Sequence, residues 1–244
     1  MMGLFNDYTR EGKGVQKDQY TPRFILFFQI YFRKFWNLIL INLLFILSCI
    51  PIITIGPATA GVTKLLRNYA REEHAFIWGD FIETAKKNFK QAFLYATLDV
   101  FVMIFLIFDF IAIGNISSRV MSILCMTAIF LAVTVWTFMR YYIYNMMVTF
   151  RLTFKQLLKN AFIFCWVGFF RNLFTTVILL TLFIFVSMLN IPYQLLIYGT
   201  LFFSFACFLI NFMVQPLIKK HMMDGFDPET GERIEEEKYE GFDE

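Results

Sequence analysis

Four charged side chains lie inside otherwise apolar runs of this sequence, and they are its main candidates for chemistry. Asp99 and Asp109 fall in one run, Arg140 in the next, and Arg171 at the start of the following one. Burying an ionised group in a bilayer costs free energy unless the group is paired or hydrated. Each of these four residues is therefore a functional candidate. Asp99 and Arg140 lie about equally far from the same end of two antiparallel runs, which predicts a contact between them. The pair either pins two helices together or lies on an ion pathway, and the two interpretations stay open.

The sequence offers no pattern for a catalytic or metal centre. Its two histidines, His74 and His221, lie outside the apolar runs and far apart. The four cysteines occur singly within apolar runs, which is typical of small buried hydrophobic side chains. Neither a phosphate-binding GxxxxGK[ST] loop nor a GxSxG turn is present. We therefore expect a protein that is not an enzyme and that needs no cofactor.

Composition places these side chains in a membrane protein. Of the 244 residues, 58% are hydrophobic and 17% are charged, whereas about a quarter are charged in soluble domains. Residues 1–221 carry a net charge of +11 and residues 222–244 a net charge of −8. The basic residues stand at the ends of apolar runs, as the positive-inside bias of membrane proteins requires. We therefore expect the lipid bilayer as a partner and exclude nucleic acid.

Five apolar runs are long enough to cross a bilayer. They are residues 35–55, 92–113, 120–142, 173–189 and 195–217. Five spans leave segments rich in lysine and arginine on both sides of the first run, against the positive-inside rule. The conflict disappears if the chain turns at Pro51 and at the pair Gly56 and Pro57, and returns as a short helix at about 57–71. In that helix Ala60 and Gly61 permit a close approach of neighbours.

The sequence thus predicts an all-α fold, a polytopic membrane helix bundle of about six membrane helices with both termini cytoplasmic. A five-span arrangement stays open. Residues 1–23 form a polar N-terminal segment, residues 24–221 a single membrane-embedded domain, and residues 222–244 an acidic cytoplasmic tail.

Interfacial amphipathic helices are expected beside the spans. One covers residues 24–32, and residues 86–93 and 155–162 share two lysines, an alanine and a phenylalanine at the same steps. Both octapeptides precede a span, so each predicts an elbow helix on the cytoplasmic face. The lysines of the two octapeptides are candidates for contacts with a cytoplasmic partner: Lys86, Lys87, Lys90, Lys155 and Lys159.

Residues 50–60, with the sequence IPIITIGPATA, resemble the YesL-like family of bacterial integral membrane proteins. Residues 65–67, the turn at 71–73 and residues 80–91 extend the resemblance. It implies a multi-pass protein of the bacterial cell membrane, encoded beside carbohydrate ABC importers, with no catalytic residues to carry over.

Two functions follow as expectations. The first is a non-catalytic accessory subunit that contacts the permeases of a carbohydrate ABC importer. The chain lacks the Glu-Ala-Ala loop that a permease offers its ATPase, so a permease itself is not expected. The alternative is an independent transporter of a small solute or ion, with Asp99, Asp109 and Arg140 along its path.

Overall fold

The computed structural model describes residues 22–116 and 118–223, and every regular element in these ranges is helical. The all-α prediction is therefore confirmed. Most of the predicted polar segment 1–23 and acidic tail 222–244 lies outside the described residues. The elements are α1 (Arg23–Arg33), α2 (Phe35–Ser48), the 3-10 turn η1 (Ile52–Thr54), α3 (Ile55–Ala70), α4 (Ile77–Lys87), α5 (Phe89–Ala112), η2 (Ile113–Asn115), α6 (Arg119–Thr149), α7 (Phe154–Val167), α8 (Phe169–Ser187), α9 (Ile191–Ile197), the π-helical η3 (Tyr198–Phe202), α10 (Phe203–Ile218) and the π-helical η4 (Lys219–Met223).

These helices repeat one arrangement three times. In each unit a short helix ends at a single non-helical residue, an apolar helix follows, and a turn leads to a returning helix; the units are α1–α2–α3, α4–α5–α6 and α7–α8–α10. The linking residues Lys34, Asn88 and Gly168 have φ of −106°, −99° and −98° and ψ of 14°, 9° and 15°. A phenylalanine follows each of them. This bridge-region conformation ends one helix and starts the next in a new direction, and α1 and α2 are bent by 71°.

The repeat has a different register from the one that the octapeptides predict. Residues 86–93 straddle the break between α4 and α5, whereas residues 155–162 all belong to α7. The prediction of two equivalent elbow helices at these residues is therefore wrong, and the equivalent helices are α1, α4 and α7. The lysines that the two octapeptides share reflect the amphipathic composition of both segments. The repeating unit is defined instead by the single non-helical residue between its first two helices.

The apolar runs correspond to helices with some corrections. In the described part of the chain four helices are long and apolar enough to cross a membrane, and the bent pair α1 and α2 makes five if it counts as one span. The predicted span 35–55 is too long, because α2 ends at Ser48 before Pro51. Its 14 residues cover about 21 Å at 1.5 Å per residue, less than the hydrocarbon thickness of about 30 Å.

The short returning helix expected at 57–71 is present as α3. The turn before it is shorter than predicted and is closed by Thr54, whose hydroxyl donates to the Pro51 carbonyl at 2.6 Å. Gly56 and Pro57 belong to the first turn of α3 and not to the loop. A proline there is compatible with the helix, because the first N–H groups of a helix have no partner within it.

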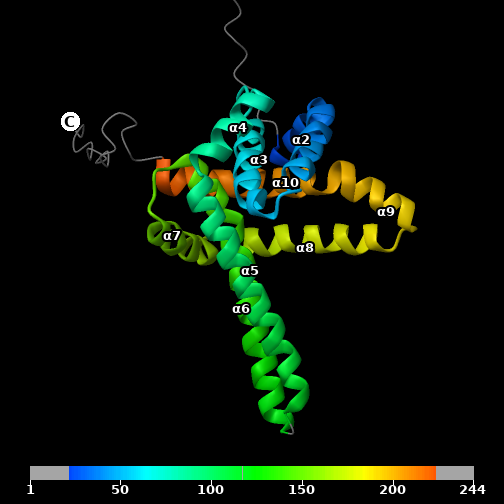
Figure 1. Cartoon of the computed structure of the whole chain (residues 1–244), viewed down its shortest axis with the longest axis vertical. Coiled ribbons are helices and arrows are strands. Elements are labelled where there is room, and N and C mark those ends of the chain that lie inside the picture. Colours follow the sequence, from blue (N-terminus) through cyan, green and yellow to red (C-terminus); the bar gives the residue numbers. More distant parts are fainter. Residues whose placement is uncertain (1–21, 117, 224–244) are drawn as a thin grey trace, which may run out of the picture.

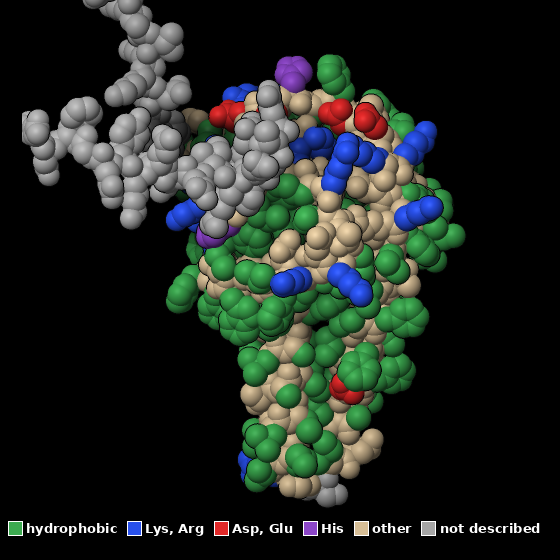
Figure 2. Space-filling view, turned by 90° about the vertical axis from the view of Figure 1, so that its left-hand side faces the viewer, with side chains coloured by type: hydrophobic (Ala, Val, Ile, Leu, Met, Phe, Trp, Pro, Cys, Tyr) green, Lys and Arg blue, Asp and Glu red, His purple; other side chains and the backbone are tan. Residues whose placement is uncertain are grey.

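Helix α3 lies at the centre and packs against α4, α5, α6 and α10. The α5–α6 hairpin projects from the body, and α8 and α10 run across its direction (Figure 1). Two apolar hairpins arranged in this way do not both stand along the normal of one flat bilayer, so at least one of them tilts in a membrane. Figure 2 shows that hydrophobic side chains cover the projecting hairpin, while most lysines and arginines lie on the body.

The three returning helices each carry a buried asparagine. Asn68 in α3, Asn145 in α6 and Asn211 in α10 are 5%, 1% and 1% exposed. Asn145 donates to the side-chain oxygen of Asn211 at 2.7 Å. Arg67 donates to Asn68 at 3.2 Å and to the hydroxyl of Thr149 in α6 at 2.6 Å. These polar bonds join the returning helices to one another, and in apolar surroundings they help to specify a single packing.

The last returning helix is irregular at η3, and a side chain from the first unit satisfies that irregularity. Asn42 in α2 is 0% exposed. Its amide nitrogen donates to the Gly199 carbonyl at 2.6 Å, and its oxygen accepts from the Ser204 amide at 3.1 Å. The Asn42 side chain thereby supplies a hydrogen-bond partner to one backbone carbonyl and to one backbone amide beside the π-helical segment.

Candidate functional site

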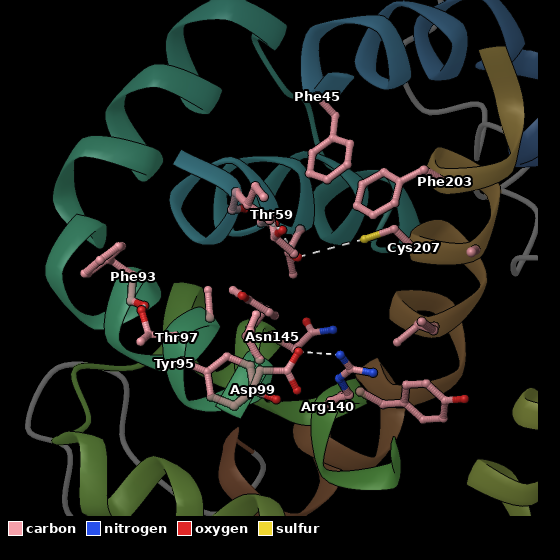
Figure 3. Close-up of a pocket in the computed structure, with 18 of the residues that line it drawn as sticks. Phe45, Thr59, Phe93, Tyr95, Thr97, Asp99, Arg140, Asn145, Phe203 and Cys207 are labelled. Atoms are coloured by element: carbon pink, nitrogen blue, oxygen red, sulfur yellow. Dashed lines mark hydrogen bonds and ion pairs between the residues drawn. The ribbon is translucent and has the colours of Figure 1, made fainter. Parts of the chain in front are cut away.

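A cavity of about 630 Å³ lies where α5, α6 and α10 meet α3 and the turn between α2 and α3. One wall is aromatic: the rings of Phe45 and Phe203 stack with their centroids 3.6 Å apart. The opposite wall holds Asp99, Arg140 and Asn145 (Figure 3). An apolar cavity with a few convergent polar groups is the usual form of a small-molecule site.

The ion pair expected from the sequence is present. Arg140 contacts one carboxylate oxygen of Asp99, and the indole nitrogen of Trp136 donates to the other at 2.8 Å. Trp136 and Arg140 lie four residues apart on α6, so both donors reach the same face of α5. The side chains of Arg140 and Asp99 are 39% and 17% exposed.

Aromatic side chains surround this pair. Tyr95 is 1% exposed, and its ring centroid lies 6.4 Å from that of Trp136 and 5.2 Å from that of Tyr144. Such apolar surroundings lower the local dielectric constant and strengthen the electrostatic attraction within the pair. Sequence reasoning missed these three aromatic residues, although each stands four residues from Asp99 or Arg140, one helical turn away.

The other two charged candidates lie elsewhere. Asp109 follows Asp99 in α5 by ten residues, about 15 Å along the helix, and it does not line the cavity. Arg171 donates to the Met213 carbonyl in α10 at 3.3 Å.

The neighbouring carbonyl, that of Phe212, accepts from Arg23 at 3.3 Å. Pro216 has no N–H to offer that carbonyl, which stands four residues before it. Arg23 and Arg171 therefore bond successive carbonyls of α10 where proline interrupts the helical pattern, which assigns Arg171 an anchoring role.

The small residues of α3 make a close approach to two helices. A Cβ on Gly56 would overlap the Ala92 carbonyl of α5 and would lie 2.9 Å from the Cβ of Ala96. A Cβ on Gly61 would lie 2.6 Å from the Phe81 ring of α4. Pro57 and Ala60 are also buried, whereas Pro51 is exposed in the turn. This part of the chain is a packing surface and contributes no polar side chain to the ion pair.

The predicted cytoplasmic contact residues are exposed and occupy two places. They are Lys86, Lys87 and Lys90 at the α4–α5 junction, and Lys155 and Lys159 in α7. Within residues 22–116 and 118–223, no group of three or more histidine, cysteine, aspartate or glutamate side chains is arranged to hold a metal ion.

Comparison with known proteins adds one finding to this geometry. No curated protein and no solved structure matches the chain. Residues 38–110, which run from α2 through α3 and α4 into α5, match the model of the family described as "Protein of unknown function, DUF624".

Proposed function

We propose that this protein is a non-catalytic accessory membrane subunit that associates with a carbohydrate ABC importer in the bacterial cell membrane. The observation that carries the proposal is the exposure of the α5–α6 hairpin. In the most apolar stretches of the helices Phe89–Asn115 and Arg119–Thr149, 6% and 0% of the residues are buried within the chain. Membrane helices associate by packing against neighbours, and these two leave most of their surface free for the helices of another protein.

The choice of an importer as partner rests on the resemblance to the YesL-like family. The chain lacks the loop by which a permease holds its ATPase, which favours an accessory role over a permease. In this proposal both termini are cytoplasmic, and the exposed lysines of the α4–α5 junction and α7 form the cytoplasmic contact surface together with the acidic tail.

The test is copurification in mild detergent from bacterial membranes, with an unrelated membrane protein as the control bait. Enrichment of permease and ATPase subunits is expected. Phe130→Ala combined with Leu131→Ala trims two hairpin side chains that are 70% and 57% exposed, and it should reduce that enrichment. Phe185→Ala combined with Ile184→Ala on α8, at 62% and 52% exposure, is the matched control. If the importer subunits are no more abundant than with the control bait, the proposal fails.

The cavity favours a second function, transport of a small solute or ion past Asp99 and Arg140. Asp109 would not contact the solute in this cavity, because it lies about 15 Å further along α5 than Asp99. Purified protein in liposomes should then take up solute, and Asp99→Asn should abolish the uptake. Uptake that this change leaves intact, or no uptake at all, removes the transporter.

A further inference from the structure

We infer that the cavity beside Asp99 and Arg140 binds a neutral single-chain amphiphile, such as a monoacylglycerol, that enters from the bilayer. This assigns a ligand site to a protein whose proposed role above needs none. The inference rests on the apolar entrance, the size of the cavity, the hydrogen-bonding groups at its inner end and the absence of net charge there.

The entrance is apolar and open. Ile52, Ile53, Val100 and Phe101 line the cavity, and they are 81%, 59%, 57% and 66% exposed. In a membrane these side chains face lipid, so a hydrocarbon chain passes between them without losing apolar contact. The volume of about 630 Å³ lies in the range of about 300–1,000 Å³ that ligand pockets occupy. It corresponds to roughly 20 water-sized groups of about 30 Å³ each, enough for one acyl chain and a small head group.

The inner end offers hydrogen-bond donors. The guanidinium of Arg140 has five N–H groups, and its side chain remains 39% exposed beside Asp99. Figure 3 shows the guanidinium at the edge of the cavity next to Asn145. Trp136 and Arg140 each donate to one oxygen of Asp99, and the N–H groups of Arg140 that Asp99 does not use are donors for a ligand. They select a ligand oxygen that accepts a hydrogen bond.

The α3 wall offers acceptors instead. The hydroxyl of Thr59 donates to the Ile55 carbonyl at 2.7 Å, and that of Thr63 donates to the Thr59 carbonyl at 2.7 Å. Each hydroxyl proton is thereby used within α3, and each oxygen keeps lone pairs that can accept, although the Thr63 oxygen also lies 3.9 Å from the Cys207 sulfur. Thr59 and Thr63 both line the cavity. A ligand hydroxyl can accept from Arg140 and donate to a threonine oxygen, whereas a ketone or an ether can only accept.

A buried hydrogen-bond acceptor in the cavity wall also favours a ligand with hydroxyl groups. Asn145 lines the cavity and is 1% exposed, and its side-chain oxygen has no hydrogen-bond partner. An unpaired buried acceptor is destabilising. A ligand hydroxyl that reached this oxygen would pair it, and the glycerol group of a monoacylglycerol carries two hydroxyls.

The charge balance selects a neutral head group. Asp99 and Arg140 compensate one another, and the remaining residues that line the cavity are uncharged. An anionic or cationic head group would add an uncompensated charge to an apolar site, which is costly. A monoacylglycerol is therefore favoured over a fatty acid with the same chain.

The test is native mass spectrometry of the purified full chain, titrated with monolauroylglycerol or dodecanoic acid in the same detergent. We expect one bound monolauroylglycerol per chain and binding of dodecanoic acid at least about tenfold weaker, the loss that an uncompensated charge produces. Ala206→Phe fills the cavity, in which Ala206 is a wall residue, and should abolish the adduct. Ala128→Phe adds the same side chain at an exposed site of the projecting hairpin and should leave it unchanged.

A second variant tests the polar end without leaving a lone charge. The double change Asp99→Asn with Arg140→Gln keeps the cavity neutral and removes the guanidinium donors, so binding should weaken about tenfold. Equal adducts with Ala206→Phe and Ala128→Phe would show that the amphiphile binds the outer surface, and the inference would be wrong. Binding of dodecanoic acid as tight as that of monolauroylglycerol would also overturn it.

Discussion

Replacement of Gly56 by alanine tests the packing on which the whole bundle depends. The added Cβ would lie 2.8 Å from the carbonyl carbon of Ala92 and 2.9 Å from the Cβ of Ala96, whereas carbon atoms at optimal contact are about 3.5–4.0 Å apart. Backbone and a short side chain cannot rotate away, so α3 and α5 must separate by up to about 1 Å. Such overpacking costs about 1–3 kcal/mol. The gain in helix propensity from glycine to alanine is at most about 1 kcal/mol, so destabilisation prevails.

Two other glycines serve as matched controls. The Cβ of an alanine at Gly61 would meet atoms of the Phe81 ring at 2.6 and 2.9 Å and the Phe81 carbonyl oxygen at 3.0 Å. The ring can shift and the backbone contact is less close than that at Gly56, so this change should cost less than Gly56→Ala. At Gly114 nothing lies within 4 Å, and alanine should be neutral or stabilising by up to about 1 kcal/mol. The assay is equilibrium unfolding in mixed micelles with increasing dodecyl sulfate, followed by far-UV circular dichroism. The reasoning is refuted if Gly56→Ala is as stable as the wild type, or if Gly114→Ala loses as much.

Three further predictions concern the first unit and the ion pair. Asn42→Leu removes the partner of the Gly199 carbonyl in η3 and of the Ser204 amide at the start of α10, and it should cost about 2 kcal/mol or more in the same unfolding assay; an unchanged midpoint would contradict the pairing. Asp99→Asn should destabilise by about 1–3 kcal/mol because Arg140 loses its charged partner, and the double change with Arg140→Gln should recover part of the loss, whereas additive losses would argue against a coupled pair. A reporter enzyme fused after Arg71 should be active in the cytoplasm; an extracytoplasmic signal would exclude the return of α3 across the membrane.

Contacts between consecutive helices joined by a short turn were predictable, because they depend on residues that lie close together in the sequence. A tight turn between two apolar runs makes the helices antiparallel, so Asp99 and Arg140 had to come close if they stood at similar depth. The helix after Pro51 was predictable for a similar reason, since the charge pattern required the chain to return. The end of α2 was misplaced because the run of residues 35–55 was delimited by its lack of charge, although a helix is expected to end before Pro51.

The long-range parts were beyond single-sequence reasoning. The bond between Asn42 and the η3 segment joins residues more than 150 positions apart, and an asparagine in an apolar run does not indicate its partner. The aromatic surroundings of the ion pair depend on helix rotation, which an apolar all-round pattern leaves undefined. The three-unit repeat was hidden because its marker is a backbone conformation shared by a lysine, an asparagine and a glycine.

The contacts that set the direction of the α5–α6 hairpin all lie near its base. Asn145 bonds Asn211 of α10 at 2.7 Å, and Tyr141 bonds Thr176 of α8 at 2.8 Å, both within the last turns of α6. In the distal half of the hairpin, the hydroxyls of Thr127 and Thr134 donate to carbonyls of their own helix. The hairpin also joins α4 through Asn88 alone. Because the cavity is walled by α5, α6 and α10 at the same level, a molecule that fills it contacts both crossing hairpins, and its presence bears directly on the angle between them.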